Sequence, residues 1–264
     1  MDTPQLTVDQ ALLTLEKTTQ FHLGAQMVRR FGGMPHISGD TVAEHLARCL
    51  RLAAYLMPFL QAELDHLPGH ELFGELLYTT LLFHDDDEIV AGHDIPSPLK
   101  QHNSKDEQEI EDLRRSLGVL TPTQQQYALK PFAEFRARQT VIAGVAKVID
   151  RVTANQLIIE QKLCLVAPDS AKYALEYIRD PLVVHKSKTT DVLLEAQTRQ
   201  IVDERNKIKN DEAFIVETAR SISNDQRCSK TADQMTETIK RLLVIDLDSY
   251  SYHQEDIMKP LWEY

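Results

Sequence analysis

The sequence is poor in glycine, with nine in 264 residues, and it contains one tryptophan and only 6% aromatic residues. So few glycines leave few of the tight turns that β-hairpins need. We also find no sustained alternation of Val, Ile and Thr with polar residues, which a half-buried strand would show. These absences disfavour a sheet core. The many Leu, Ala, Glu, Gln and Lys residues instead predict an all-α protein.

Cysteine is also scarce, and the three residues Cys49, Cys164 and Cys228 form no Cys-x-x-Cys pair. An odd, widely spaced set suits a reducing compartment, and its spacing argues against a zinc site built from cysteines. The sequence shows no apolar run of membrane-spanning length and no signal peptide at its start. We therefore expect a cytoplasmic protein without a membrane partner.

Positive charge is in short supply, since 29 Lys and Arg face 40 Asp and Glu, for a net charge of -11. Such a chain repels a phosphate backbone, and no cluster of Lys and Arg stands out as a local exception. We expect no nucleic-acid polymer as a partner. A small phosphorylated metabolite stays open, because one arginine or one metal ion can hold a phosphate.

The hydrophobic pattern predicts a domain over residues 1–185 and a C-terminal helical extension over residues 186–264, packed on it. Thr41 and Glu44 form a capping box that opens a helix, which we expect to stop near Pro58. Further helices are expected over residues 8–31, 72–84, 106–117, 121 onward, 139–165, 191–209, 211–223 and 231–247. The last three are amphipathic and suit helices that lie against an existing surface.

The most conspicuous feature of the chain is a run of four acids, Asp85–Glu88, directly after His84 and an apolar segment. A carboxylate carried into a core is costly unless something positive compensates it, and a metal ion is the simplest compensation. The run can also be a solvated face. Acids at a helix C-terminus are disfavoured by the helix dipole, which favours a functional role.

Two further polar residues lie within predicted helices, His45 one turn into the second helix and Asp150 in the middle of a long buried one. Two imidazoles and two carboxylates would together suit a transition-metal ion, with hydrolysis as the natural chemistry. The set is His45, His84, Asp85 and Asp150. Taken singly, His45 can be a satisfied core or surface histidine, and Asp150 can be paired with Lys147 or Arg151.

The order of these four residues resembles the H…HD…D signature of the HD-domain metal-dependent phosphohydrolases, an all-helical superfamily. The segments 42–45 and 84–100 are similar to the bacterial 5′-deoxynucleotidase branch, and the resemblance covers about residues 15 to 165. It implies an HD-domain helical bundle. It also implies one divalent metal ion, Mn, Co, Zn, Ni, Fe or Mg, bound by His45, His84, Asp85 and Asp150.

The resemblance assigns roles to residues around the metal. Glu88 would be the catalytic acid or base, and Arg30, with Lys147, would hold the substrate phosphate. Phe31 would pack against the deoxyribose, where the branch has a tryptophan.

The loop after Glu88 completes the implied site. Asp94 would bond the sugar hydroxyl and take part in catalysis, and Pro96 would shape the same wall. One extra residue, His93, separates Glu88 from Asp94 in comparison with the branch.

We therefore expect hydrolysis of deoxynucleoside 5′-monophosphates to deoxynucleoside and phosphate, by a homodimer or higher homo-oligomer. An alternative is a deoxynucleoside triphosphate triphosphohydrolase, in which Lys100, Lys105 and Lys147 supply the charge that three phosphates need. A third interpretation is a non-catalytic helical interaction protein with a structural metal centre.

Overall fold

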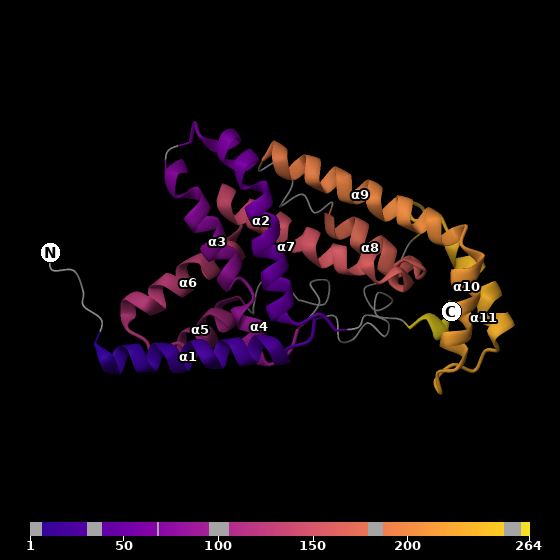
Figure 1. The fold of residues 1–264 in the computed structure, drawn as a ribbon, viewed down its shortest axis with the longest axis horizontal. Coiled ribbons are helices and arrows are strands. Elements are labelled where there is room, and N and C mark those ends of the chain that lie inside the picture. Colours follow the sequence, from indigo (N-terminus) through magenta and orange to yellow (C-terminus); the bar gives the residue numbers. More distant parts are fainter. Residues whose placement is uncertain (1–6, 31–38, 68, 95–105, 179–186, 251–259) are drawn as a thin grey trace. The chain divides into compact units, whose positions relative to one another are not determined.

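The computed structural model describes residues 7–30, 39–67, 69–94, 106–178, 187–250 and 260–264, and these residues form helices and turns (Figure 1). The α-helices are α1 (Val8–Met27), α2 (Val42–Leu64), α3 (Phe73–Phe83), α4 (Asp86–Ala91), α5 (Asp106–Ser116), α6 (Pro122–Ala137), α7 (Val141–Glu160), α8 (Pro168–Ile178), α9 (Lys188–Lys209), α10 (Glu212–Ser223) and α11 (Ala232–Leu243). Short 3₁₀ turns are η1 (His70–Leu72), η3 (Lys162–Leu165) and η5 (Leu261–Glu263). Among the described residues there is no β-strand, only an isolated bridge between Arg29 and Thr41. The all-α prediction is confirmed.

The chain forms two compact units, and the division falls inside α7. Unit 1 comprises residues 1–30 and 39–150, and unit 2 comprises residues 31–38 and 151–264. Asp150 is thus the last residue of unit 1, and Arg151 belongs to unit 2. The predicted division after residue 185 lies elsewhere in the chain and stays a prediction.

Unit 1 is built around a core between α2, α3, α6 and the first half of α7. Its buried side chains are Cys49, Ala53, Leu60, Leu64, Phe73, Leu77, Leu81, Phe135, Val145, Ala146 and Ile149. Burying a Leu, Ile, Val or Phe side chain, as most of these are, stabilises a fold by roughly 1.5–3 kcal/mol each. The core therefore stabilises the positions of the helix ends that border it.

The predicted capping box at the start of α2 is present: Thr41 Oγ1 accepts the Glu44 N–H, and the Glu44 carboxylate accepts the Thr41 N–H. The predicted stop at Pro58 is wrong, because α2 continues to Leu64 with Pro58 inside it. Proline removes one backbone donor, but Pro58 lies on the exposed side, where water can satisfy the freed carbonyl. Burial of Leu60 and Leu64 beyond it favours continuing the helix.

The acid run begins a helix of its own. His84 ends α3, Asp85 precedes α4, and Asp86, Asp87 and Glu88 occupy the first turn of α4. The expectation that these acids lie at a helix C-terminus was therefore wrong, since the positive end of the α4 dipole stabilises them. The Gly92 N–H closes the helix on the Glu88 carbonyl at 2.9 Å with φ of 74°, a conformation that favours glycine.

A glycine lets α1 approach α4 closely. A Cβ atom on Gly24 would lie 2.6 Å from Cγ2 of Ile89, which is shorter than any ordinary contact. Ile89 follows Glu88 in α4, so the spacing between the two helices bears on where Glu88 lies. Gly24 is thus a packing residue, although it sits in the interior of a helix, where glycine costs about 1 kcal/mol.

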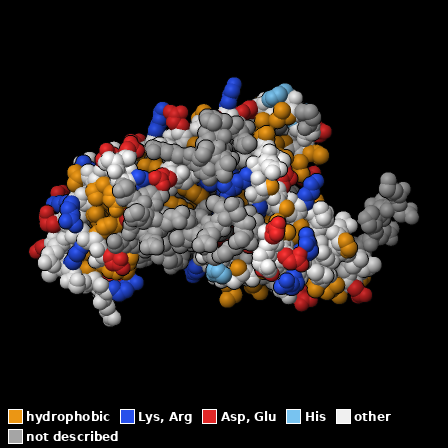
Figure 2. Space-filling model, turned by 180° about the vertical axis from the view of Figure 1, so that it is seen from behind, with side chains coloured by type: hydrophobic (Ala, Val, Ile, Leu, Met, Phe, Trp, Pro, Cys, Tyr) orange, Lys and Arg blue, Asp and Glu red, His pale blue; other side chains and the backbone are white. Residues whose placement is uncertain are grey.

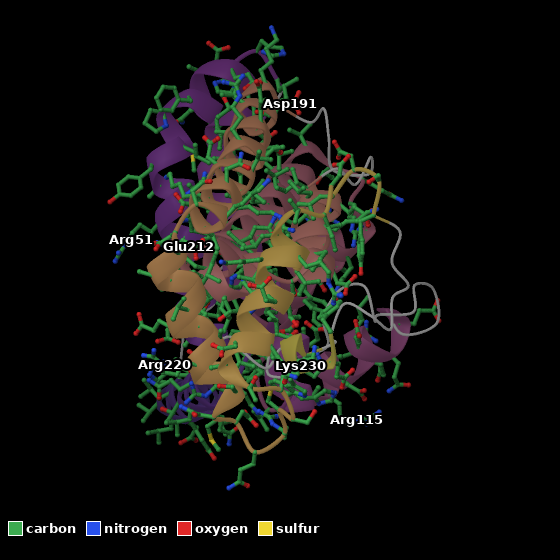
Figure 3. The ribbon with its side chains drawn as sticks, turned by 90° about the vertical axis from the view of Figure 1, so that its right-hand side faces the viewer. Arg51, Arg115, Asp191, Glu212, Arg220 and Lys230 are labelled. Carbon is green, nitrogen blue, oxygen red and sulfur yellow. The ribbon has the colours of Figure 1, made fainter. Side chains whose placement is uncertain are left out.

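Unit 2 consists of the second half of α7 and the helices α8 to α11, of which α10 and α11 pack as a helical pair. The three helices predicted over residues 191–247 are present as α9, α10 and α11 with shifted ends, whereas α8 was not predicted. Glu212 and Arg220, labelled in Figure 3, lie in the first and last turns of α10, where each charge suits the helix dipole.

Buried polar side chains fasten the helices of unit 2 to one another. Arg205 of α9 donates to the carbonyls of Leu165, Val166 and Leu242, the last at 2.8 Å. Gln197 donates to the carbonyl of Val152 at 2.6 Å. Each of these bonds joins a buried side chain of α9 to the backbone of another segment of unit 2.

The described surface carries both signs of charge. Figure 2 shows Lys and Arg side chains interspersed with Asp and Glu on the visible face. Within the described part of the chain, no helix is both long and apolar enough to cross a bilayer.

Candidate metal centre

Four helices of unit 1 bring the predicted metal ligands together. His45 lies in the first turns of α2, His84 ends α3, Asp85 precedes α4, and Asp150 lies in α7. All four are buried. Nε2 of His45 lies 3.1 Å from Oδ1 of Asp150 and 3.7 Å from Oδ2 of Asp85. Nε2 of His84 lies 3.3 Å from the same Asp85 oxygen and 3.6 Å from the same Asp150 oxygen.

Two of these distances, 3.1 and 3.3 Å, fit donors that share one ion, and the other two, 3.6 and 3.7 Å, are slightly longer. Ligands held about 2.0–2.2 Å from a metal lie roughly 3.0–3.5 Å from one another. The His84 ring supports this interpretation, because its Nδ1 bonds the Leu81 carbonyl at 2.8 Å, which places the Nε2 lone pair toward the carboxylates. That Nε2 is buried without a hydrogen bond among the described residues, as an atom kept for a metal would be.

Cys49 was not among the predicted ligands, although it lies beside them. Its Sγ, His45 and His84 offer donor atoms within 4.8 Å of one another, so this group could also hold a metal ion. Sγ lies 3.4 Å from Nε2 of His45 and 4.0 Å from Nδ1. A donor ahead of the Nε2 lone pair would be about 2 Å farther from Nδ1 than from Nε2. The sulfur therefore lies beside the ring, and the carboxylates face the lone pair. The i,i+4 spacing from His45 on one helix could have revealed this neighbour.

Two positively charged side chains contact the carboxylates of the predicted metal ligands. Arg30 pairs with Asp85, and its other terminal nitrogen lies 3.9 Å from Asp150. A short backbone bridge holds Arg30 in place, since its N–H donates to the Asp40 carbonyl at 2.8 Å. Nζ of Lys147 lies 2.6 Å from Asp150. The pairing of Asp150 with Lys147 that the sequence left open is therefore present, and the same carboxylate also faces both histidines.

The surroundings shift the pKa values of the two histidine rings in opposite directions. Burial, with Arg30 nearby, lowers the pKa of His45 to about 4, so its ring is neutral at pH 7. Burial also acts to lower the pKa of His84, but the Asp85 and Asp150 carboxylates outweigh it and raise that pKa.

Both carboxylates stay ionised. Burial alone would raise the pKa of each carboxyl. For Asp85, the neighbouring His84 and Arg30 outweigh burial and hold the pKa below its ordinary value. For Asp150, Lys147 and the neighbouring His45 ring outweigh burial, so its pKa is well below the ordinary value.

The predicted catalytic residues lie around Arg30. Burial acts to lower the pKa of the Arg30 guanidinium, but the charges of Asp85, Glu88, Asp150 and Asp94 outweigh it and raise that pKa well above its ordinary value. Glu88 is buried and Asp94 is half-buried. His93, the extra loop residue, is exposed, and its Nδ1 lies 3.0 Å from the Ala91 carbonyl.

Not every predicted site residue can be placed. Phe31 and Pro96 lie outside the described residues. The roles of the placed residues as ligands, acid or base, and phosphate binders stay predictions that their positions suit.

The middle acids of the run point elsewhere. Asp87 pairs with Arg136 of α6, which also lies 3.0 Å from Glu109 of α5. Asp86 is buried, and burial together with the charges of Asp87 and Asp85 raises its pKa well above the ordinary value. The acid run therefore divides, with Asp85 and Glu88 near Arg30 and Asp87 bracing neighbouring helices.

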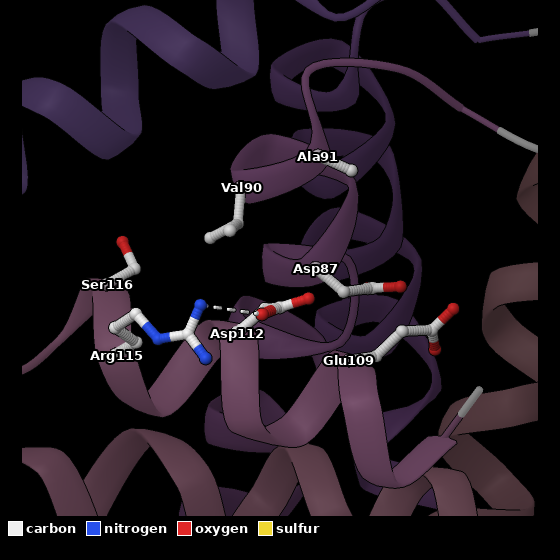
Figure 4. Close-up of a pocket in the computed structure, with 7 residues that line it drawn as sticks. All are labelled: Asp87, Val90, Ala91, Glu109, Asp112, Arg115 and Ser116. Carbon is white, nitrogen blue, oxygen red and sulfur yellow. Dashed lines mark ion pairs between the residues drawn. The ribbon is translucent and has the colours of Figure 1, made fainter. Parts of the chain in front are cut away.

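A cavity of about 380 Å³ opens beside Asp87, between α4 and α5 (Figure 4). Its lining is Asp87, Val90, Ala91, Glu109, Asp112, Arg115 and Ser116. The ion pair of Arg115 with Asp112, at 3.4 Å, crosses part of its wall. None of the four predicted metal ligands lines this cavity, so it is distinct from the candidate metal centre.

Comparison with known proteins identifies the family of the chain. No curated protein and no solved structure matches the chain significantly. A family model described as the HD domain matches residues 28–174, a span that contains Arg30, Glu88 and all four predicted metal ligands. Since that span exceeds half of the 264 residues, the chain belongs to the HD domain family, and this membership indicates metal-dependent phosphohydrolase activity.

Proposed function

We propose that this HD domain hydrolyses deoxynucleoside 5′-monophosphates, releasing a deoxynucleoside and phosphate. The proposal is supported mainly by the convergence of two imidazoles, two carboxylates and Arg30 at one buried point, with Glu88 close to Arg30. It is further supported by the similarity of segments 42–45 and 84–100 to the 5′-deoxynucleotidase branch.

Each residue has a task that its position suits. A divalent ion held by His45, His84, Asp85 and Asp150 would acidify water and draw charge from a phosphoryl oxygen. Arg30 presents a planar fork of donors for two phosphate oxygens. Glu88, a buried carboxylate near that fork, would take the proton of the attacking water or return it to the leaving sugar oxygen.

A product assay tests the bond that is cleaved. The protein is incubated with deoxynucleoside monophosphates, ribonucleoside monophosphates and deoxynucleoside triphosphates, each with Mn, Co, Zn, Ni, Fe or Mg. We expect inorganic phosphate from the deoxynucleoside monophosphates. Release of triphosphate from a deoxynucleoside triphosphate would replace this proposal with the triphosphohydrolase alternative.

The variant Glu88→Gln tests the proton-transfer role. We expect the turnover rate to fall by about 10²–10⁴-fold while metal affinity, measured by titration calorimetry, changes little. A Glu88→Gln protein as active as the wild type would remove Glu88 from the mechanism.

A structural metal centre would give a different pattern. In that case the protein would stay inert toward every nucleotide with every ion and would unfold when a chelator removes the metal. That combination would support the interaction-protein interpretation in place of catalysis.

A further inference from the structure

Phe135 lies against two parts of the candidate metal centre. It belongs to α6, an element that carries none of the four predicted metal ligands. Its side chain is buried, and its ring centroid lies 5.0 Å from that of His84, with 63° between the two ring planes. Aromatic rings favour such an edge-to-face arrangement. Nζ of Lys147 lies over the same phenyl ring, 4.7 Å from its centroid, which is the geometry of a cation–π contact.

The contact with Lys147 extends to a second predicted ligand. Nζ of Lys147 also lies 2.6 Å from Oδ2 of Asp150, one turn further along α7, and the other Asp150 oxygen lies 3.1 Å from Nε2 of His45. A lysine side chain loses much rotamer freedom when it is held in one position. The phenyl ring offsets part of that loss, because a cation–π contact is stronger where water is excluded, and Lys147 is buried. Phe135 therefore limits where the ammonium lies, and the ammonium limits where the carboxylate lies.

We propose that Phe135 is a positioning residue of the candidate metal centre, which orients the His84 ring by direct contact and the Asp150 carboxylate through Lys147. The His84 ring is already held at one atom, since its Nδ1 lies 2.8 Å from the Leu81 carbonyl, and the phenyl contact limits its rotation about that bond. Replacing side chains that hold metal ligands in this way changes metal affinity by about 10–100-fold. The inference rests on the ligand set of the proposed function and holds whichever nucleotide is the substrate.

Phe132, one turn earlier in α6, is the matched control. It is also fully buried, and the Arg136 guanidinium lies over its ring at 5.2 Å from the centroid. Arg136 pairs with Asp87 and lies 3.0 Å from Glu109, and neither of these acids is a predicted metal ligand. The two phenylalanines thus share a helix, burial and a cation above the ring. They differ in what that cation contacts, so comparing them separates positioning of ligands from packing of the core.

Titration with Co²⁺ tests the proposal, because the visible absorption of bound Co²⁺ depends on the geometry of its ligands. A chelator first removes any metal from the purified protein. Phe135→Leu should weaken Co²⁺ binding by about 10–100-fold and shift the absorption bands, whereas Phe132→Leu should bind like the wild type. Urea titration should show that both variants fold and lose a similar amount of stability. Phe135→Met, which keeps more of the volume, takes the same test if Phe135→Leu does not fold.

Two outcomes of this titration would overturn the proposal. One is a Phe135 variant with the affinity and absorption bands of the wild type. The other is equal weakening in the Phe135 and Phe132 variants, which would reduce Phe135 to a packing residue.

A double-variant cycle tests the part of the role that passes through Lys147. Lys147→Met should itself weaken Co²⁺ binding, because Asp150 loses the ammonium beside it. Adding Phe135→Leu to Lys147→Met should then weaken binding by a smaller factor than Phe135→Leu does alone, since the two changes act through one shared contact. Equal factors in both backgrounds would overturn the action through Lys147.

Binding and turnover together separate this inference from the proposed function. A protein that binds Co²⁺ with the expected effects of Phe135→Leu, yet hydrolyses no nucleotide, would end the proposed function and leave Phe135 its role. Hydrolysis of deoxynucleoside monophosphates by a protein whose Phe135→Leu variant binds Co²⁺ normally would do the reverse. A wild type that binds no Co²⁺ would overturn both.

Discussion

The buried polar side chains of the two units have different roles. In unit 1, His45, His84, Asp85 and Asp150 face one another, and within the described part of the chain the His84 Nε2 has no hydrogen-bond partner. In unit 2, Arg205, Gln197 and Asn155 each donate to backbone carbonyls of another segment. Polar groups that end on backbone fasten helices, whereas polar groups that converge on one point form a binding site.

This difference predicts that substitutions in the two units affect activity and stability differently. Substitutions of the side chains that face one another in unit 1 should lower activity and leave the fold unchanged, because their partners are other side chains of the same site. Substitutions of the unit 2 side chains that donate to backbone carbonyls should lower stability and leave the activity per folded molecule unchanged. Each such substitution removes a hydrogen bond between two segments.

The largest expected effect is on His84. His84→Gln should lower phosphate release by about 10³-fold or more and abolish binding of one equivalent of metal, since the donor set loses an imidazole. The control is His70→Gln, in which a half-buried histidine also lies with Nδ1 near a carbonyl three residues earlier, at 3.1 Å. Equal metal content in the two variants, measured by atomic emission, would remove His84 from the candidate metal centre.

The next effect is on Arg205, and it concerns stability. Arg205→Met should lower the free energy of unfolding by about 3 kcal/mol, because three buried carbonyls lose a charged donor. Arg199→Met, on the same helix with a side chain 75% exposed, should change it by less than about 0.5 kcal/mol. Urea titration measures both. A drop in turnover for folded Arg205→Met would break the contrast between the units.

A smaller effect tests whether helix packing reaches Glu88. Gly24→Ala should destabilise unit 1 by about 1–2 kcal/mol and slow turnover about tenfold, because the new Cβ collides with Ile89. Gly74→Ala is the control, since its Cβ would find its nearest neighbour, Met57 Sδ, at an ordinary 3.5 Å. The double variant Gly24→Ala/Ile89→Ala should recover turnover. Failure to recover would separate the α1 to α4 contact from the activity.

The smallest effect concerns a buried thiol in unit 2. Burial raises the pKa of Cys164 from 9.0 to about 12, so the unfolded chain loses this proton at lower pH than the folded one. Stability should therefore fall as pH rises from 9 toward 12, by about 1 kcal/mol per unit from this group. Denaturant titrations at pH 8 and pH 10 should show a smaller loss for Cys164→Ala than for the wild type. Equal losses would contradict the assignment.

Local signals in the sequence predicted most of the fold. The capping box of Thr41 and Glu44 and the apolar pattern of α3 and α7 are short-range features, and they hold in the structure. The stop at Pro58 failed because burial of Leu60 and Leu64 outweighs one lost hydrogen bond. The end of α3 near His84 was predicted, but the short helix α4 directly after it was not, since no turn residue marks a new helix within the acid run.

The sequence predicted which residues form the candidate site, but it did not predict all of their contacts. Side-chain type and order on the chain suggested His45, His84, Asp85 and Asp150, and the fold brings all four within contact distance. That Arg30 reaches Asp85, and that Cys49 lies beside His45, depends on how helices distant in sequence approach one another. Spacing along the chain does not contain that information.

The position of His84 and Asp85 between two helices has a consequence for local opening of the chain. A six-residue helix such as α4 is too short to persist in water by itself. Its first residues follow directly on His84 and Asp85, so a cation held by that pair would clamp the end of α3 to the start of α4. Amide hydrogen exchange in α4 should then slow when the ion is added, and the order of the helix that carries Glu88 becomes a measure of ion occupancy.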